Sequence, residues 1–508
     1  MRNLLKNERF GGRALVVGGG IGGSLCAAAL ARHFDKVVVF ERDRLPEDSQ
    51  ARPGVPQGHH NHFMLAGGMQ AIEELLPGID SLLDSRGAPL SDWGLGVLQW
   101  EGPGKTVPRH ECGVAMRNAS RGLFEWAIRR KLGELANVEI RQRHQVTGLL
   151  PDPRGSGVTG LRARDLSSGS EHDDVGDLIV CSPGRHVKPL KRWLQSLGYE
   201  WPRESRIEPN VHYASRFYRW RGGQQPDWTI SFYLRPGTAL LCNFLENDTF
   251  LLGTCALGAA EEPPKTEAAF TRSFRESDVP LFYEMACRGE PISKVHGWRV
   301  TEDRMVHFED VPHWPDGLVL VGDSVCAFNP IHGQGMSACA RVALRLHHEL
   351  NAWNQQSLRG FSGHMQKTVP EIYADPWWLS TNFDLQLSST TGPAPSWVDL
   401  FGMWYLEQIR AAARRHPQVR QAFAAAKHML RPVASLLAAD VLVPTLRDYM
   451  ERCDASSEAS KDAYVPSLCQ LTELSALPRL ATPLQRPPSP AARANDFQTH
   501  DQKGGSHA

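Results

Sequence analysis

The chain has 508 residues, enough to bury a sizeable core and to form two or three domains. Its 56 Lys plus Arg balance 56 Asp plus Glu, which argues against nucleic-acid binding through a basic surface. Ten scattered cysteines without a CxxC pair indicate reduced thiols rather than disulfides or a zinc site. Neither an apolar signal core nor a membrane-length apolar stretch occurs in the sequence, so we expect a cytoplasmic protein without a membrane span.

The first predicted elements are a strand, a helix and a second strand, at residues 14–17, 25–33 and 37–40. The strands are apolar runs typical of a buried parallel sheet, and the helix is rich in Ala and Leu. Glu41 ends the second strand, about 20 residues past the glycines, where a dinucleotide site needs an acid for the ribose hydroxyls.

The turn before that helix has the spacing Gly18-x-Gly20-x-x-Gly23. Gly18 allows a tight turn, Gly20 lets a pyrophosphate approach the backbone, and Gly23 lets the helix pack close to the strand. The helix N-terminus adds free N–H groups and a positive dipole end. Strand, glycines, helix, strand and acid in this order predict a dinucleotide site.

A polar loop at residues 42–57 leads into the segment 59–78, which continues after its first residues as an amphipathic helix ended by Pro77-Gly78. Its start carries His59, His60 and His62. They can be metal ligands, or they can line a polar loop near the cofactor or cap the helix. We favour the second interpretation, because no Cys, Asp or further His completes a ligand set at metal spacing.

The next segment predicts a helix over residues 116–132, capped by Asn118 or Ser120, and then three strands. The strands are expected at residues 138–141, 158–164 and 178–181, and the last belongs to the parallel sheet. Residues 209–256 then alternate between apolar and polar, which predicts an antiparallel sheet with two different faces. An aromatic, apolar sheet inserted in an α/β chain suits the wall of a substrate cavity.

Residues 317–348 repeat the first pattern, with a buried strand, Gly322-Asp323, Asn329-Pro330, Gly333-Gln334-Gly335 and a helix from Met336. An acid at a strand end can hold a ribose or ribitol hydroxyl, and a glycine-rich helix start can hold a pyrophosphate or a ring edge. Residues 350–450 are expected to be mostly helical, with 410–420 as a solvated basic helix face, and residues from 456 to be a disordered tail.

Together these motifs resemble FAD-dependent monooxygenases of the aromatic hydroxylase class. Residues 52–78 and 313–340 are similar to a bacterial branch that includes the flavin epoxidases of polyether pathways. The resemblance implies an α/β fold: a discontinuous FAD-binding Rossmann-like domain of the glutathione-reductase type (10–85, 116–190, 291–350), an antiparallel β-sheet substrate domain (86–115, 191–290) and a C-terminal helical region (351–455).

The resemblance also implies the role of each motif residue. Gly18, Gly20 and Gly23 meet the FAD pyrophosphate, and Glu41 holds the adenosine ribose. Asp323, after Gly322, holds the ribitol or pyrophosphate side. Two further sets of residues complete the predicted cofactor site. Segments that approach FAD contain Arg42, Arg52 and Arg121. The isoalloxazine ring is bordered by Pro330, Gly333, Gly335 and Met336.

Three positions depart from the branch's usual pattern. His59 stands where Arg is usual, Cys181 where a strand usually ends in Asp, and His332 where an aromatic is usual. His332 is a catalytic candidate that can protonate the oxidant or hydrogen-bond near the flavin, and a packing role is at least as favoured. Arg216 and Arg304 can meet a substrate carboxylate or the NAD(P)H phosphate, although exposed surface roles are commoner.

In the implied reaction, NAD(P)H reduces FAD, and O2 then gives a flavin C4a-hydroperoxide that oxygenates an apolar small molecule. We expect epoxidation of a polyketide or terpenoid alkene, or alternatively hydroxylation of an aromatic or quinoline ring. A FAD-dependent reductase or dehydrogenase, a halogenase and a non-enzymatic NAD-binding protein rank lower. For the halogenase, the reason is that the Trp-x-Trp-x-Ile-Pro segment of that class is absent. A second GxGxxG is also absent, so NAD(P)H docks transiently or a separate flavin reductase helps.

Overall fold

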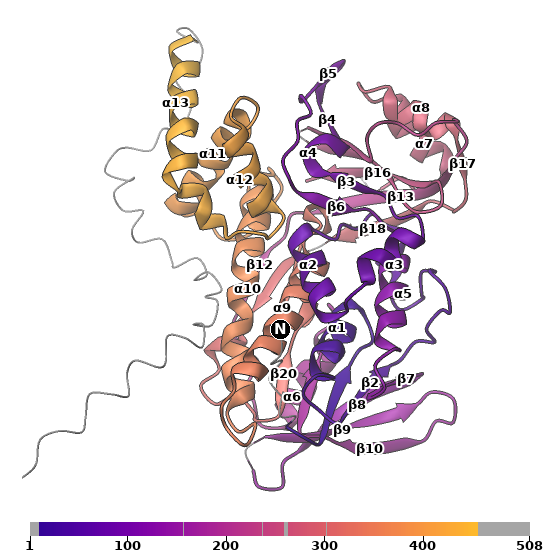
Figure 1. Cartoon of the computed structure of the whole chain (residues 1–508), viewed down its shortest axis with the longest axis vertical. Coiled ribbons are helices and arrows are strands. Elements are labelled where there is room, and N and C mark those ends of the chain that lie inside the picture. Colours follow the sequence, from indigo (N-terminus) through magenta and orange to yellow (C-terminus); the bar gives the residue numbers. More distant parts are fainter. Residues whose placement is uncertain (1–9, 156, 236, 259–262, 301, 456–508) are drawn as a thin grey trace, which may run out of the picture.

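The computed structural model describes residues 10–455 except 156, 236, 259–262 and 301, so the predicted tail from residue 456 lies outside the described residues. Figure 1 shows a parallel sheet with its helices in the lower part, a large sheet at the upper right, and helices α11–α13 at the upper left. Within the described residues, no helix combines the length and the apolar character needed to cross a membrane.

A five-stranded parallel sheet forms the centre of the lower part, in the order β20-β11-β1-β2-β7. Its strands are β1 (Arg13–Val17), β2 (Lys36–Glu41), β7 (Val138–Gln142), β11 (Leu178–Cys181) and β20 (Leu318–Leu320). The apolar runs are buried because helices α1 (Ile21–Leu30), α5 (Arg121–Leu132) and α9 (Gly335–Ala352) cover the sheet, with α1 against both others. The predicted parallel strands and the Rossmann-like fold are therefore confirmed.

Two smaller antiparallel sheets flank it. One contains β8 (His144–Pro151), β9 (Val158–Asp165) and β10 (Glu171–Val175), and the other contains β12 (Glu204–Ile207), β19 (Asp303–Val306) and β21 (Cys326–Ala327). Helix α6 (Lys188–Ser196) follows β11. A two-stranded pair, β3 (Leu90–Asp92) with β6 (Ala115–Arg117), and the short helix α4 (Trp93–Gly96) lie near the large sheet.

The large sheet has the order β17-β13-β16-β15-β14-β4-β5, and β18 also pairs with β13. Its strands are β4 (Val97–Gly102), β5 (Lys105–Thr106), β13 (Val211–Trp220), β14 (Ile230–Arg235), β15 (Thr238–Phe244), β16 (Thr249–Leu257), β17 (Gly289–Pro291) and β18 (His296–Val300). Its pairings are antiparallel except β14 with β4, which is parallel. The sheet is therefore mixed where an antiparallel one was expected.

Most aromatic side chains of this sheet face away from the parallel-sheet half of the molecule. Phe244 and Phe250 join a core with Phe270, Phe274 and Phe282 of the helical layer α7 (Glu267–Arg275) and α8 (Leu281–Arg288). The aromatic side chains expected to line a cavity thus mostly form a structural core. The side chains of a strand alternate between the two faces of the sheet, and here most of the aromatic ones lie on the face that packs against α7 and α8.

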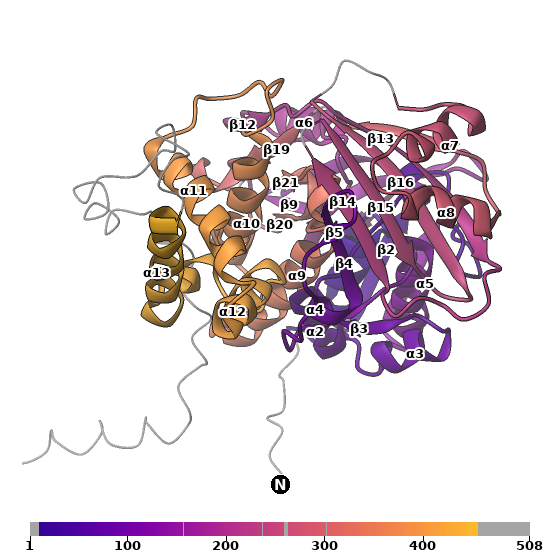
Figure 2. The ribbon, with the colours of Figure 1, turned by 90° about the horizontal axis from the view of Figure 1, so that it is seen from above.

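The remaining helices are α2 (Ala66–Leu75), α3 (Ile79–Ser85), α10 (Phe361–Asp384), α11 (Trp397–Ala412), α12 (Pro417–Lys427) and α13 (Ala439–Ala455). Short 3-10 turns lie at η1 (Pro56–His59), η2 (Phe308–Asp310), η3 (Gly322–Ser324), η4 (Pro330–His332) and η5 (Val433–Leu437). Figure 2 shows α10–α12 on one side of β4 and β14, with α7 and α8 on the other.

The structure tests three predictions about where helices begin and end. The histidines lie before α2, in the 3-10 turn η1 and an extended segment, which agrees with the favoured interpretation of a polar loop; the side chains of His59 and His60 contact the large sheet. Residues 115–117 form β6, and α5 begins only after Ser120, whose hydroxyl accepts a hydrogen bond from the Leu123 N–H. Residues 410–420 are the end of α11, a turn and the start of α12 rather than one helix face, since His416 precedes the Pro417 that begins α12.

Candidate active site

The first glycine turn is shaped by close packing at two glycines and by open space at a third. Gly18 has φ +94°, and a Cβ there would lie 2.4 Å from the carbonyl oxygen of Ser182. A Cβ on Gly23 would lie 1.9 Å from the Gly18 carbonyl oxygen. At Gly20 only the Arg52 Nη2, at 3.5 Å, comes close, so a ligand can approach the backbone at the start of α1.

Arg52 is the centre of a buried group of charges beside this turn. Its Nη1 lies 3.0 Å from Glu41 Oε2 and 2.9 Å from Asp43 Oδ2, and its Nε donates to Glu125 Oε2 at 3.0 Å. Glu41 Oε2 also accepts from the Gly19 N–H at 2.8 Å. Burial works to lower the pKa of Arg52, but the surrounding carboxylates raise it above its usual value. These residues therefore form one network of buried ion pairs, with Arg52 among three carboxylates, that fixes the second strand's acid under the glycine turn.

Arg121 extends the unit toward the histidines. Its Nε donates to Glu125 Oε1 at 2.9 Å, and its Nη1 lies 3.2 Å from His62 Nε2. Burial and the nearby Arg121 charge lower the pKa of His62 to about 3, so this imidazole is neutral at neutral pH. Arg42 stands apart, with an exposed side chain 3.9 Å from Asp43 Oδ1.

The histidine segment, residues 59–63, connects this unit to the large sheet. The ring of His59 stacks on His296 of β18 at 3.9 Å between centroids. His60 Nδ1 lies 3.1 Å from the Ser215 hydroxyl of β13. The described residues contain no group of three or more metal-ligating side chains that could hold an ion.

The second glycine segment meets the first one at the turn after β11. A Cβ on Gly22 would lie 3.0 Å from Ser182 Oγ, and one on Gly322 would lie 3.1 Å from the same atom. Cys339 Sγ of α9 lies near both positions, at 3.4 Å and 3.7 Å. The Gly322 N–H donates to the buried Tyr373 hydroxyl at 3.0 Å, and Asp323 beside it is half-buried. Two motifs some 300 residues apart are thus neighbours at one end of the parallel sheet.

The segment from Pro330 to Met336 lies against the histidine segment. Gly333 has φ +64°, and a Cβ there would lie 2.8 Å from the ring of Phe63. Gly335 has no heavy atom within 4 Å of its Cβ position, so its backbone is open to a ligand, whereas Met336 is buried. Leu65 N–H donates to the Ser337 hydroxyl at 2.8 Å, which attaches the start of α9 to the residues before α2.

His332 lies in a deeply buried polar cluster. Its Nε2 is 3.6 Å from Asp384 Oδ1, and its ring packs edge-on against Phe383 at 5.2 Å. Burial lowers the pKa of His332 to about 4. No sequence motif pointed to Asp384, which comes from the far end of α10.

An apolar wall lies between the large sheet and α10. It is made by Val211 and Leu257 with Tyr213, Cys255, Trp298, Ile331, Phe383 and Leu387. This set places apolar side chains of β13, β16 and β18 next to the residue before His332. It is a smaller and less aromatic surface than the sequence predicted.

Two arginines that were expected on the surface are buried. The Arg216 Nη2 lies 2.8 Å from Glu267 Oε1, and its Nε donates to the Ser293 carbonyl. Arg304 is 5% exposed and pairs with Glu302 at 2.8 Å. Both are already neutralised by a carboxylate, which explains how they are tolerated inside the protein.

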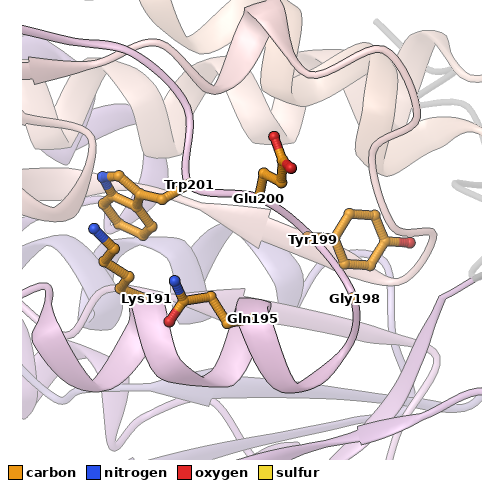
Figure 3. Close-up of a pocket in the computed structure, with 6 residues that line it drawn as sticks. All are labelled: Lys191, Gln195, Gly198, Tyr199, Glu200 and Trp201. Atoms are coloured by element: carbon orange, nitrogen blue, oxygen red, sulfur yellow. The ribbon is translucent and has the colours of Figure 1, made fainter.

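A surface pocket of about 480 Å³ lies elsewhere, at the end of α6. Figure 3 shows Lys191 and Gln195 projecting from this helix toward Trp201, with Tyr199 and Glu200 on the following segment. None of the predicted cofactor residues lines this pocket, so it does not belong to the candidate site.

A family model described as an NAD(P)-binding Rossmann-like domain matches residues 16–62. Protein Rv3254 of Mycobacterium tuberculosis is 27% identical over 433 residues, which cover 81% of this chain and 88% of that protein. Kynurenine 3-monooxygenase of Salinispora tropica is 26% identical over 352 residues, covering 64% of this chain and 70% of that protein.

Solved structures agree at the level of the fold. The p-nitrophenol 4-monooxygenase PnpA from Pseudomonas putida superposes with a TM-score of 0.58 at 16% identity, covering 83% of this chain and 98% of that chain. The flavin-dependent brominase Bmp2 gives 0.59 at 16% identity, covering 88% and 100%. The chain has the fold of the FAD-dependent monooxygenases. The predictions of this fold, of FAD as cofactor and of an enzyme of this class are confirmed; the likeness to the polyether-pathway branch is not shown by these comparisons.

The residues of this monooxygenase fold suit FAD. The backbone is open at Gly20 and at Gly335, two of the glycines that the motifs place against the cofactor. Gln334 Oε1, in the residue before Gly335, is buried without a hydrogen-bond partner among the described residues. Such an orphaned acceptor costs free energy unless a ligand donor meets it. Sequence reasoning missed Asp43, Glu125 and Ser182, of which only Glu125 had a local signal, four residues after Arg121.

Proposed function

We propose that this protein is a monooxygenase that epoxidises an alkene of an apolar polyketide or terpenoid, with NAD(P)H as electron donor. The observation that carries the proposal is the meeting of the two glycine segments at Ser182 and Cys339, next to an apolar wall on the large sheet. One long cofactor can bind along both segments, and a small molecule can lie between its reactive end and that wall.

In this proposal each motif residue meets one part of FAD. Gly18, Gly20 and Gly23 approach the pyrophosphate, and Glu41 accepts from the adenosine ribose. Asp323 holds the ribitol side. Arg52 keeps Glu41 in place by direct contact, and Arg121 is connected to Arg52 through Glu125. The backbone from Pro330 to Met336 borders the isoalloxazine ring.

Bound FAD supplies the electrons that activate O2 for transfer of one oxygen atom. The overall reaction takes alkene, O2, NAD(P)H and one proton to epoxide, water and NAD(P)+. The chain's part is to exclude water and to orient the alkene, and the wall around Tyr213, Trp298 and Phe383 serves this. No strong protein base is required for epoxidation.

Hydroxylation of an aromatic or quinoline ring is the second candidate. It is favoured by the similarity to kynurenine 3-monooxygenase and to p-nitrophenol 4-monooxygenase, whose names describe aromatic substrates. The fold also occurs in the brominase Bmp2, so the fold alone does not separate oxygenation from halogenation.

The test is turnover of the FAD-loaded protein with isotopically labelled O2, NADH or NADPH and panels of alkenes and aromatic rings. An alkene product that carries one labelled oxygen supports epoxidation, and a labelled phenol supports the alternative. A halogenated product with added bromide, a product gaining two hydrogens, or a protein that does not bind FAD contradicts the proposal. Activity only with an added flavin reductase would identify a separate reductase as partner.

A further inference from the structure

Asp303 and Asp384 form a buried carboxyl pair beneath the Asn329-Pro330 turn. Both are 0% exposed, Asp303 on β19 and Asp384 at the end of α10, and Asn329 is hydrogen-bonded to both carboxyl groups. The Asn329 backbone N–H donates to Asp303 Oδ1, and its side-chain Nδ2 donates to Asp384 Oδ1 at 2.9 Å. The Ser380 hydroxyl donates to Asp303 Oδ1 at 3.3 Å.

Two adjacent carboxylates without a cation cannot both be ionised in such a place. No Lys or Arg of the described chain is ion-paired with either residue, and the nearest ionisable partner is His332 Nε2, 3.6 Å from Asp384 Oδ1. Burial raises the pKa of Asp303 well above its usual value, and it raises that of Asp384 to about 6. The pair as a unit therefore retains one proton at neutral pH.

Three polar atoms of this cluster lack hydrogen-bond partners. Asp303 Oδ2, Asp384 Oδ2 and His332 Nε2 are all buried without a hydrogen-bond partner in the described structure. The His332 side chain keeps 15% of its surface exposed although Nε2 is buried, so another edge of the ring is accessible. The ring thus lies between the carboxyl pair and the accessible side, next to the proposed flavin edge.

We propose that Asp303 and Asp384 share one proton and exchange it with Nε2 of His332, so that the pair is the proton store for the oxygen reaction. This use of the proton rests on the proposed function. One proton from solvent is consumed with the hydride of NAD(P)H for every water formed. The O–H bond of the pair breaks, an N–H bond forms at His332, His332 releases a proton on its accessible side, and solvent restores the pair.

Other charged and titratable groups also face the cluster. Lys427 of α12 opposes a positive charge on His332, while Cys326 of β21 lies near Asp303 and Cys255 of β16 lies near Asp384. Both thiols have their pKa raised, mainly by burial, and stay neutral. The proton is therefore confined to the two carboxyls and the imidazole.

The first test does not depend on turnover. Infrared spectra of the full-length protein near neutral pH, in H2O and D2O, should show the C=O band of a protonated buried carboxylic acid. The band should be lost in Asp303→Asn/Asp384→Asn. It should be retained in the control Asp375→Asn, because Asp375 is a half-buried aspartate of α10 that accepts a hydrogen bond from the Val433 N–H and lies outside the pair. If the double variant does not fold, Asp384→Asn should still alter the band. The proposal is overturned if wild type lacks the band, or if the band is unchanged in Asp303→Asn/Asp384→Asn or in Asp384→Asn.

The second test addresses exchange with His332. In histidine-labelled protein, nuclear magnetic resonance should show a changed tautomer ratio of the His332 ring in Asp384→Asn and an unchanged one in Asp375→Asn. In the FAD-loaded enzyme, Asp384→Asn should lower the amount of product formed per O2 consumed severalfold and should shift the pH dependence of this ratio. Unchanged tautomers and pH profile would overturn the relay. If the band and the tautomer change are present but no substrate is oxygenated, the proton sharing stands and the proposed function fails.

Discussion

Arg52 and Glu125 are joined by a hydrogen bond of 3.0 Å although they lie 73 residues apart, and each is at most 7% exposed. Replacing Arg52 by Met leaves three acidic side chains around an empty cationic position. Loss of one partner from a buried ion pair costs about 3–5 kcal/mol, so we expect a lower midpoint of urea unfolding and weaker FAD retention.

The pH dependence of this loss has a defined sign. Burial favours the neutral form of Glu125, but Arg121 and Arg52 lower its pKa below the usual 4.5. The stabilisation is therefore present above about pH 4.5 and is lost as the pH falls through the folded-state pKa. The stability gap between wild type and Arg52→Met should shrink in acid. Arg162→Met, which breaks an exposed pair with Asp173, should destabilise the protein much less than Arg52→Met, because solvent screens an exposed ion pair. An equal loss of stability in the two variants would contradict this account.

Gly23→Ala tests whether Gly23 is needed for the close packing of α1 against the first glycine turn, rather than for backbone flexibility. The added methyl group would overlap the Gly18 carbonyl oxygen, so α1 must move away from β1. Overpacking typically costs about 1–3 kcal/mol, and the displaced helix start should also bind FAD more weakly. Thermal unfolding and flavin absorbance measure both effects. Gly148→Ala, which has open space around its Cβ position, is the matched control and should leave both unchanged.

The neutral histidine His60 should make the fold sensitive to mild acid. Burial, with His296 and His59, lowers its pKa from 6.5 to about 3. The unfolded chain takes up a proton first, so stability is full above about pH 6.5 and falls by up to about 1.4 kcal/mol per pH unit below it. His60→Gln should flatten this acid limb in urea titrations between pH values near 7 and near 5. His186→Gln, at an exposed position, should not.

Lys427 should destabilise the resting protein at neutral pH. Its Nζ lies 4.5 Å from the centre of the Trp93 ring, and burial, aided by Arg410, lowers its pKa from 10.5 to about 8. Charging this amine costs stability below about pH 8, and the cost disappears as the pH rises toward 10.5. Lys427→Met should therefore gain about 1–3 kcal/mol near pH 7, with a gain that shrinks in base. No gain over the exposed Lys367→Met would contradict the assignment.

The local motifs were sufficient to predict the parallel sheet and the first turn. Residues 14–17 and 37–40 carry continuous apolar runs, and the glycine spacing between them has few other physical explanations. The prediction of the second segment also succeeded as a strand followed by a helix, β20 and α9.

What could not be predicted depends on contacts between distant parts of the chain. The histidine segment was expected to line a polar loop or to cap a helix, but its sequence could not show that His60 contacts Ser215 or that His59 stacks on His296, more than 150 residues away. The orientation of the aromatic residues in the large sheet was set by α7 and α8, which the alternation pattern cannot reveal. Asp384 has no neighbouring motif, and only the fold brings it to His332.

Phe63 packing on Gly333 ties the loop that touches the large sheet to the loop proposed to border the flavin. A ligand that orders one of these loops must also favour one arrangement of the other. By thermodynamic linkage, the factor by which FAD changes the affinity for substrate equals the factor by which substrate changes the affinity for FAD. We therefore expect the substrate to tighten FAD binding and FAD to tighten substrate binding by the same factor, which equilibrium dialysis with either ligand can measure.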